Sequence, residues 1–166
     1  MSGIETRDLT LRHITVKTGV PFDGFVRTLE SQLGRHDPSA YLKLMTDPSQ
    51  AEKVEAIINS QLGPSGMVLF MTWPLGLLLA LKDRPAKARQ YIVGNPFFAF
   101  RLARHDIRAA LDAPLRVLVY EDAEDKAVVE YDTPSSIFGW LQNPEIDLVA
   151  KSLDEKLANL VQKSSA

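Results

Sequence analysis

The chain has 166 residues and a formal net charge of −2, and 45% of its residues are hydrophobic and 24% charged. These values are typical of one globular domain that buries a substantial core, so we expect a single domain over residues 1–166. The absence of cysteine excludes a disulfide framework, a thiolate nucleophile and cysteine-ligated metal sites. The slightly acidic total charge gives no general attraction to polyanions, so we expect neither a nucleic-acid nor a membrane partner.

The N-terminal residues, MSGIETRDLT, lack the basic and then apolar segments of a signal peptide. The longest apolar run, Met67–Leu81, is interrupted by Trp-Pro-Leu-Gly and is shorter than the roughly 18 to 20 residues that span a bilayer. We therefore expect a soluble, cytoplasmic protein.

In the N-terminal half, residues 8–18 are rich in β-branched residues and predict a strand that stops at Gly19. Helical spacing of apolar residues predicts a helix over 22–33, ended by Gly34. The stretch 35–46 shows no clear pattern. Asp47 and Pro48 open a second predicted helix over 47–63, which would be an embellishment of the main fold.

Strand and helix patterns then alternate. Residues 67–72 predict a buried strand, 73–82 fit either a strand or a helix, and 89–93 predict a short strand followed by a helix over 96–110. Residues 114–120 and 127–131 predict an antiparallel hairpin across the polar turn EDAEDK, and an apolar stripe over 146–160 predicts a closing helix.

This order of a strand, a helix, several strands and a closing helix favours an α+β fold with a mainly antiparallel sheet and helices packed on one face. The second face of such a sheet needs cover as well. We therefore expect a homodimer.

The GNP turn at 94–96 invites comparison with phosphate-binding loops. Asn95 is a good N-cap, because its side-chain oxygen can accept from free amides of the first turn, and Pro96 at the first helical position loses no hydrogen bond. Asp47-Pro48 and Asn143-Pro144 repeat the device. Neither a P-loop nor a dinucleotide-binding glycine pattern is present. The turn is thus explained as a helix start that retains some affinity for anions.

Charged residues are unevenly distributed. Basic residues dominate between Lys82 and Arg108, and acids dominate between Glu121 and Asp132. This pattern fits either a basic site for a small anionic ligand or solvated faces that pair with each other or with a second copy. Within the basic stretch, Arg101 lies nearest to the GNP turn, so we expect it to face a concave site lined by Phe97, Tyr120 or Tyr131.

The predicted hairpin offers a second group of polar side chains. Strand alternation brings several of them toward one sheet surface, where they would supply an anion clamp, phenol donors and a carboxylate base. The alternative is that Arg116 pairs with acids across the hairpin and that the tyrosines only pack. The candidate ligand-binding residues of the chain are Asn95, Arg101, Arg116, Tyr120, Glu121, Tyr131 and Asp132.

The three histidines, His13, His36 and His105, show no metal-binding spacing, so their roles stay open and we expect neither a metal nor another cofactor.

Residues 89–141 contain, in order, the GNP turn, the strand PLRVLVYE and the segment YDTPSS, and VAKSLDEKLANL follows. In motif order and spacing they resemble the family known as domain of unknown function 302. The resemblance implies a compact α+β fold similar to that of the TATA-binding protein, often as a dimer, and it implies no reaction.

Two hypotheses about function follow. The first is a homodimeric small-molecule binding or accessory protein, whose pocket would lie between the sheet, the helix after the GNP turn and possibly the partner subunit. The second is a cofactor-independent enzyme, such as an isomerase, cyclase or hydrolase, that uses tyrosine and a carboxylate as acid and base. A pocket whose titratable group has a strongly displaced pKa would favour the enzyme.

Overall fold

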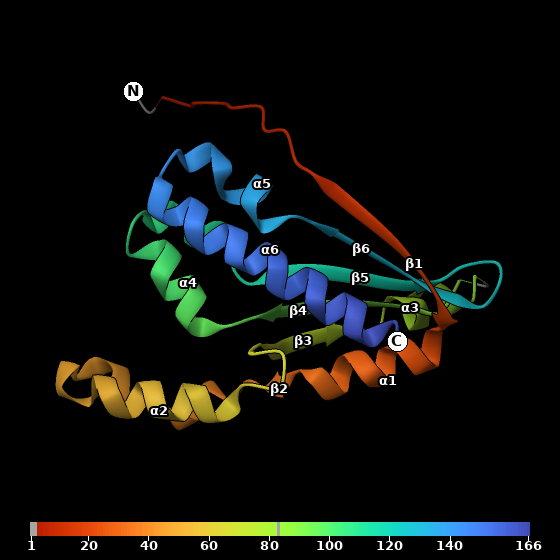
Figure 1. Ribbon diagram of the computed structural model, residues 1–166, viewed down its shortest axis with the longest axis horizontal. Helices are drawn as coiled ribbons and strands as arrows, with labels where there is room; N and C mark the ends of the chain where they lie inside the picture. The colour runs from red at the N-terminus through yellow and green to blue at the C-terminus, as the bar shows by residue number, and fades with distance from the viewer. Residues whose placement is uncertain (1–2, 83) are drawn as a thin grey trace.

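The computed structural model describes residues 3–82 and 84–166 (Figure 1). Its centre is a six-stranded sheet in the order β1-β6-β5-β4-β3-β2. All neighbouring strands are antiparallel except β2 and β3, which are parallel. The strands are β1 (His13–Pro21), β2 (Gly34–Arg35), β3 (Val68–Trp73), β4 (Ala88–Gly94), β5 (Leu115–Glu121) and β6 (Lys126–Asp132). The predicted α+β class and the mainly antiparallel sheet are confirmed.

Six α-helices and five short 3-10 helices accompany the sheet within the described residues. The α-helices are α1 (Phe22–Gln32), α2 (Ala51–Gln61), α3 (Leu75–Ala80), α4 (Pro96–Ala103), α5 (Pro134–Phe138) and α6 (Pro144–Ser164). The 3-10 helices are η1 (Pro38–Ala40), η2 (Leu44–Thr46), η3 (Pro48–Gln50), η4 (Ile107–Asp112) and η5 (Gly139–Leu141). No helix in the described part of the chain is long and apolar enough to cross a bilayer.

The core lies between the sheet and the long helix α6, which lies over the sheet beside α1 (Figure 1). Strand alternation sends one set of side chains toward these helices, so Tyr91, Val117 and Val129 are fully buried against the apolar stripes of α1 and α6. The opposite set points to the other face of the sheet, which we call the open face. Helices thus cover one face, as the element order predicts.

Several predicted helix starts are built as expected. The side chains of Asp47, Asn95 and Asn143 each accept a hydrogen bond from the amide two residues later, and each is followed by proline at the first helical position. At Asp47 the capped element is the 3-10 helix η3 and not the predicted α-helix, which begins only at Ala51 as α2.

The predicted helix over 96–110 is too long. It ends at Ala103, and the side chain of Asp106 caps the separate 3-10 helix η4 through the amide of Arg108. Arg101 therefore lies on α4, Arg104 is the C-cap residue that follows it, and Arg108 belongs to the next element. The first strand likewise begins at His13, after an extended segment, and not at Asp8. The two-residue strand β2 was not predicted, because two residues are too few to show alternation.

Candidate functional site

An apolar cavity of about 240 Å³ opens beside the GNP turn. Residues from distant parts of the chain line it, since the segment after β2, strand β3, the GNP turn with α4, the start of β5, and helices α5 and α6 meet there. Its apolar wall consists of Phe70, Pro96, Phe98, Ala99, Leu102, Ala113, Pro114, Leu115, Phe138 and Leu153. An engineered apolar cavity of about 150 Å³ holds benzene, so this one is large enough for a compact molecule of one or two rings.

One hydrogen-bonded pair supplies most of the polar character of the cavity. His36 Nε2 lies 2.6 Å from the hydroxyl of Tyr41, and both side chains line the cavity. His36 follows the short parallel pairing of β2 with β3, and its ring lies 4.4 Å from that of Phe70, measured between centroids. The 3-10 helix η1 then turns the chain so that Tyr41 returns to the same place.

Both members of this pair are uncharged at neutral pH. Burial lowers the pKa of His36, although Asp37 opposes the shift, and burial raises the pKa of Tyr41. A neutral imidazole and a phenol can exchange donor and acceptor roles. The pair can therefore orient a third polar group, such as a carbonyl or hydroxyl of a bound molecule.

Asn95 also lines the cavity, but both ends of its amide are engaged. Oδ1 accepts from the backbone amide of Phe97 at 2.8 Å, and Nδ2 donates to the carbonyl of Gly66 at 3.0 Å. The side chain therefore ties α4 to the loop before β3. Its geometry is that of a structural residue that forms part of the cavity wall.

Two cations lie over the ring of Phe98. The guanidinium carbon of Arg101 and the ammonium of Lys156 are 5.7 and 5.6 Å from the ring centroid. Neither forms an ion pair with any residue that the structure describes. Arg101 is thus close to a cavity-lining aromatic ring, although Phe97, Tyr120 and Tyr131, which we expected beside it, do not line this cavity.

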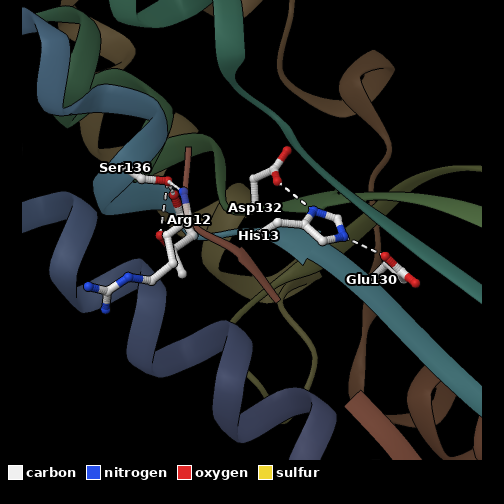
Figure 2. A network of polar contacts seen from close by, with 6 residues as sticks. Arg12, His13, Glu130, Asp132 and Ser136 are labelled. Carbon is white, nitrogen blue, oxygen red and sulfur yellow. Dashed lines mark hydrogen bonds and ion pairs between the residues drawn. The ribbon is translucent and has the colours of Figure 1, made fainter. Parts of the chain in front are cut away.

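A second cluster lies on the open face, where β1 pairs with β6 (Figure 2). His13 sits between two carboxylates: Nδ1 is 2.7 Å from Asp132 Oδ1, and Nε2 contacts Glu130 Oε2. Tyr120 donates to the other oxygen of Glu130 at 2.9 Å. The hydrogen bonds to Glu130 and then to Asp132 raise the pKa of His13, and the bond from His13 lowers the pKa of Glu130.

This cluster joins the three neighbouring strands β1, β6 and β5 and does not form a concave site. The side chain of His13 is 53% exposed, and its two ring nitrogens are both occupied by β6. Figure 2 also shows that the neighbouring Arg12 is held by its backbone amide to the hydroxyl of Ser136. These contacts attach the start of β1 to β6 and α5.

The expectation that the hairpin residues converge on one surface is correct for only some of them. Tyr120 and Asp132 share the open face, where Arg116 is exposed. Glu121 points to the helix side, where Lys87 bridges it to Asp23 of α1.

Tyr131 faces α6, and burial raises its pKa. Tyr131 and Asp132 are adjacent in β6 but face opposite sides of the sheet, because successive side chains of a strand point to opposite faces.

Sequence reasoning missed His36 and Tyr41. They lie in the stretch 35–46, which shows no periodicity, and a histidine five residues before a tyrosine is not a recognisable motif. Only the parallel pairing of β2 and β3 brings them to the GNP turn. Within the described residues, no group of three or more histidines, aspartates and glutamates has the arrangement of a metal site.

Comparison with known proteins confirms the resemblance seen in the sequence. A crystal structure of an uncharacterized conserved DUF302 protein from Bacillus stearothermophilus matches with a TM-score of 0.63, covering 91% of this chain and 96% of that chain at 14% identity. This likeness shows the fold alone. No curated protein matches the chain. The family model described as "Domain of unknown function DUF302" matches residues 45–164, and the chain therefore belongs to the DUF302 family.

Proposed function

We propose that the chain is a small-molecule binding or accessory protein that acts as a homodimer. The observation that carries this proposal is the cavity beside the GNP turn, in which apolar walls surround one neutral His36–Tyr41 pair. Ligand sites commonly combine an apolar lining with a few polar groups that orient the molecule. The preferred ligand is therefore a compact, mainly apolar molecule, with one or two rings and one hydrogen-bonding group.

The cations beside Phe98 favour an anionic group on that ligand. Arg101 and Lys156 are not paired with acids in the described part of the chain, and both lie over a ring that lines the cavity. An aromatic carboxylic acid would place its ring in the cavity and its charge near these side chains. This feature agrees with the earlier expectation of a small organic or anionic ligand.

Binding is favoured over acid and base catalysis by the character of the lining. None of the described lining residues is a carboxylate. Among the described residues, the hydrogen bonds between tyrosine and carboxylate lie elsewhere: Tyr120 with Glu130 on the open face, and Tyr91 with Glu30 of α1. A cofactor-independent enzyme would have to use His36 and Tyr41 alone.

The experiment measures the affinity of four ring compounds for the protein by calorimetry and thermal shift. Indole, 1-naphthol, 1-naphthoic acid and 1-naphthamide are titrated into the wild type and into Ala99→Leu, which adds carbon atoms inside the cavity. Ala103→Leu, on the same helix but outside the lining, is the matched control. We expect Ala99→Leu alone to abolish binding. Equal binding by both variants, or no binding by the wild type, would contradict the proposal.

Two further variants separate the polar contributions. Tyr41→Phe removes the hydroxyl, and we expect it to weaken binding of 1-naphthol by about tenfold, the usual effect of one lost hydrogen bond. Arg101→Gln should weaken the acid but not the amide. Arg104→Gln is its control, because Arg104 lies over Phe100, which does not line the cavity. Chemical conversion of a bound compound would instead indicate an enzyme.

A further inference from the structure

Residues 35–62, which we call the arm, leave and re-enter the main fold at one place. The arm contains η1, η2, η3 and α2. At its two ends the amides of Gly34 and Gly63 both donate to the carbonyl of Met67, at 3.0 Å each. The two glycines are in direct backbone contact, because a Cβ at Gly63 would lie 2.3 Å from the amide nitrogen of Gly34. The arm is therefore a closed loop whose ends meet at one point.

The polar contacts of the arm are almost all internal. The side chain of Gln61 accepts from the amide of Asp37 and donates to its carbonyl, at 2.9 Å each, and so joins the start of the arm to α2. Among the described residues, the only hydrogen bond between residues 36–62 and the main fold is donated by the amide of His36 to the carbonyl of Leu69, at 3.4 Å. No ion pair in the described part of the chain joins them.

The apolar contacts of the arm are also separate from the main core. Helix α2 packs against η2 and η3 of the arm itself. The buried apolar residues of the arm are Tyr41 and Ile58, and neither belongs to the core cluster between the sheet and α6. Figure 1 shows α2 beyond the β2 edge of the sheet. The arm is thus a small unit beside the main fold and not a part of its core.

The arm nevertheless supplies the histidine and the tyrosine of the cavity beside the GNP turn. The ring of His36 lies against that of Phe70, and Tyr41 is only 6% exposed, so the arm closes one side of the cavity. His36 and Tyr41 are hydrogen-bonded to each other. Movement of the arm away from the cavity therefore breaks no hydrogen bond between these two side chains and the opposite wall.

We propose that the arm is a lid of this cavity, which swings about Gly34 and Gly63, opens to admit a ligand, and brings His36 and Tyr41 onto it as it closes. The inference rests on the proposed ligand site and adds how access to that site is controlled. Hinges of this kind are a few residues at the ends of elements. A ligand that contacts both rings binds the closed form better and so shifts the population toward it.

The experiment measures distances between pairs of spin labels by electron paramagnetic resonance. The chain has no cysteine, so introduced cysteines can be labelled without background. Glu55→Cys on α2 and Leu148→Cys on α6 report the position of the arm, since both side chains are exposed. We expect two distances for this pair in the unliganded protein and the loss of one of them when 1-naphthol is added.

Two control pairs locate the movement. Ala123→Cys with Leu148→Cys lies wholly in the main fold, and Lys43→Cys with Glu55→Cys lies wholly in the arm; all four positions are exposed. Each control pair should give one distance, with or without 1-naphthol. A change in the pair at 123 and 148 would contradict a movement confined to the arm.

Calorimetry on the labelled protein distinguishes failure of the lid from failure of the ligand site. If the protein binds 1-naphthol but the labels at 55 and 148 keep one unchanged distance, the lid is wrong and the ligand site stands. If two distances occur but 1-naphthol does not bind, the arm moves as proposed and the proposed ligand site is wrong.

Gln61→Ala tests whether the arm acts as one unit. Gln61 does not line the cavity, but it joins Asp37 to α2. We expect this variant to weaken binding of 1-naphthol by about tenfold, the usual effect of lost hydrogen bonds, and to broaden the distance between labels at Lys43 and Glu55. Ser60→Ala, which alters an exposed neighbour in α2, is the control and should change neither. Wild-type affinity and an unchanged distance in Gln61→Ala would overturn the proposal.

Discussion

Replacement of Asn95 by alanine tests how the GNP turn is built. The side chain is buried and makes two hydrogen bonds, one to the amide of Phe97 in α4 and one to the carbonyl of Gly66. Loss of an N-cap costs about 1 kcal/mol. The carbonyl of Gly66, which is partly buried, loses its donor, and this loss adds about 1 to 3 kcal/mol. We therefore expect Asn95→Ala to reduce the free energy of unfolding by about 2 to 4 kcal/mol.

The assay is urea denaturation followed by circular dichroism, with thermal melting alongside. For a domain of this size each kcal/mol lowers the melting temperature by about 2 to 4 °C, so a fall of roughly 4 to 16 °C is expected. Asn143→Ala is the matched control. It removes a cap from α6 whose side chain accepts from the amides of Glu145 and Ile146 but makes no hydrogen bond to a distant segment among the described residues. It should cost only about 1 kcal/mol.

Asn95→Ser separates the two contributions, because serine keeps the capping oxygen and loses the donor to Gly66. Its stability should lie between those of the wild type and Asn95→Ala. An Asn95→Ala variant no less stable than Asn143→Ala would refute the assignment of a tertiary role to this amide. Affinity for 1-naphthol should be nearly unchanged in the folded variant, since both hydrogen-bonding groups of Asn95 are already engaged.

Three further predictions follow from local geometry. His13 has a raised pKa, so its contribution to stability is fully present below the unfolded pKa of about 6.5 and is lost as pH rises through the higher folded pKa. Denaturation at several pH values should show the greatest destabilisation by His13→Gln in acid, and an equal effect in alkali would contradict this. Gly76→Ala places a Cβ 1.9 Å from the carbonyl oxygen of Ala86 and should destabilise by about 1 to 3 kcal/mol, measured in urea. Gly34→Ala places one 1.8 Å from the carbonyl oxygen of Gln61 and should destabilise similarly; wild-type stability of either glycine variant would show that the backbone yields freely.

The sequence was sufficient wherever the deciding interaction is local. An asparagine or aspartate before proline specifies a helix start because the capping bond spans only two residues, and the caps at Asp47, Asn95 and Asn143 form as predicted. The hairpin of β5 and β6 also follows from local pattern, since alternating apolar residues flank a polar turn. The family motifs lie in this same part of the chain, and the family match confirms them.

Tertiary structure decided the features that depend on contacts between distant segments. Residues 73–82 fit two conformations by sequence, and the close approach of Gly76 to Ala86 accompanies the helix that forms. The sheet order places β1 beside β6, so that His13 meets Glu130 and Asp132 more than a hundred residues away.

The candidate cavity depends on the same kind of contact. His36 and Tyr41 reach the GNP turn only through the parallel pairing of β2 with β3, which involves two residues of each strand. Side-chain alternation predicts which residues share a face of a strand, but it does not predict which strands are neighbours in the sheet. That choice is made by the burial of the whole core, and it brings the histidine–tyrosine pair, Phe98 and Leu153 around one cavity.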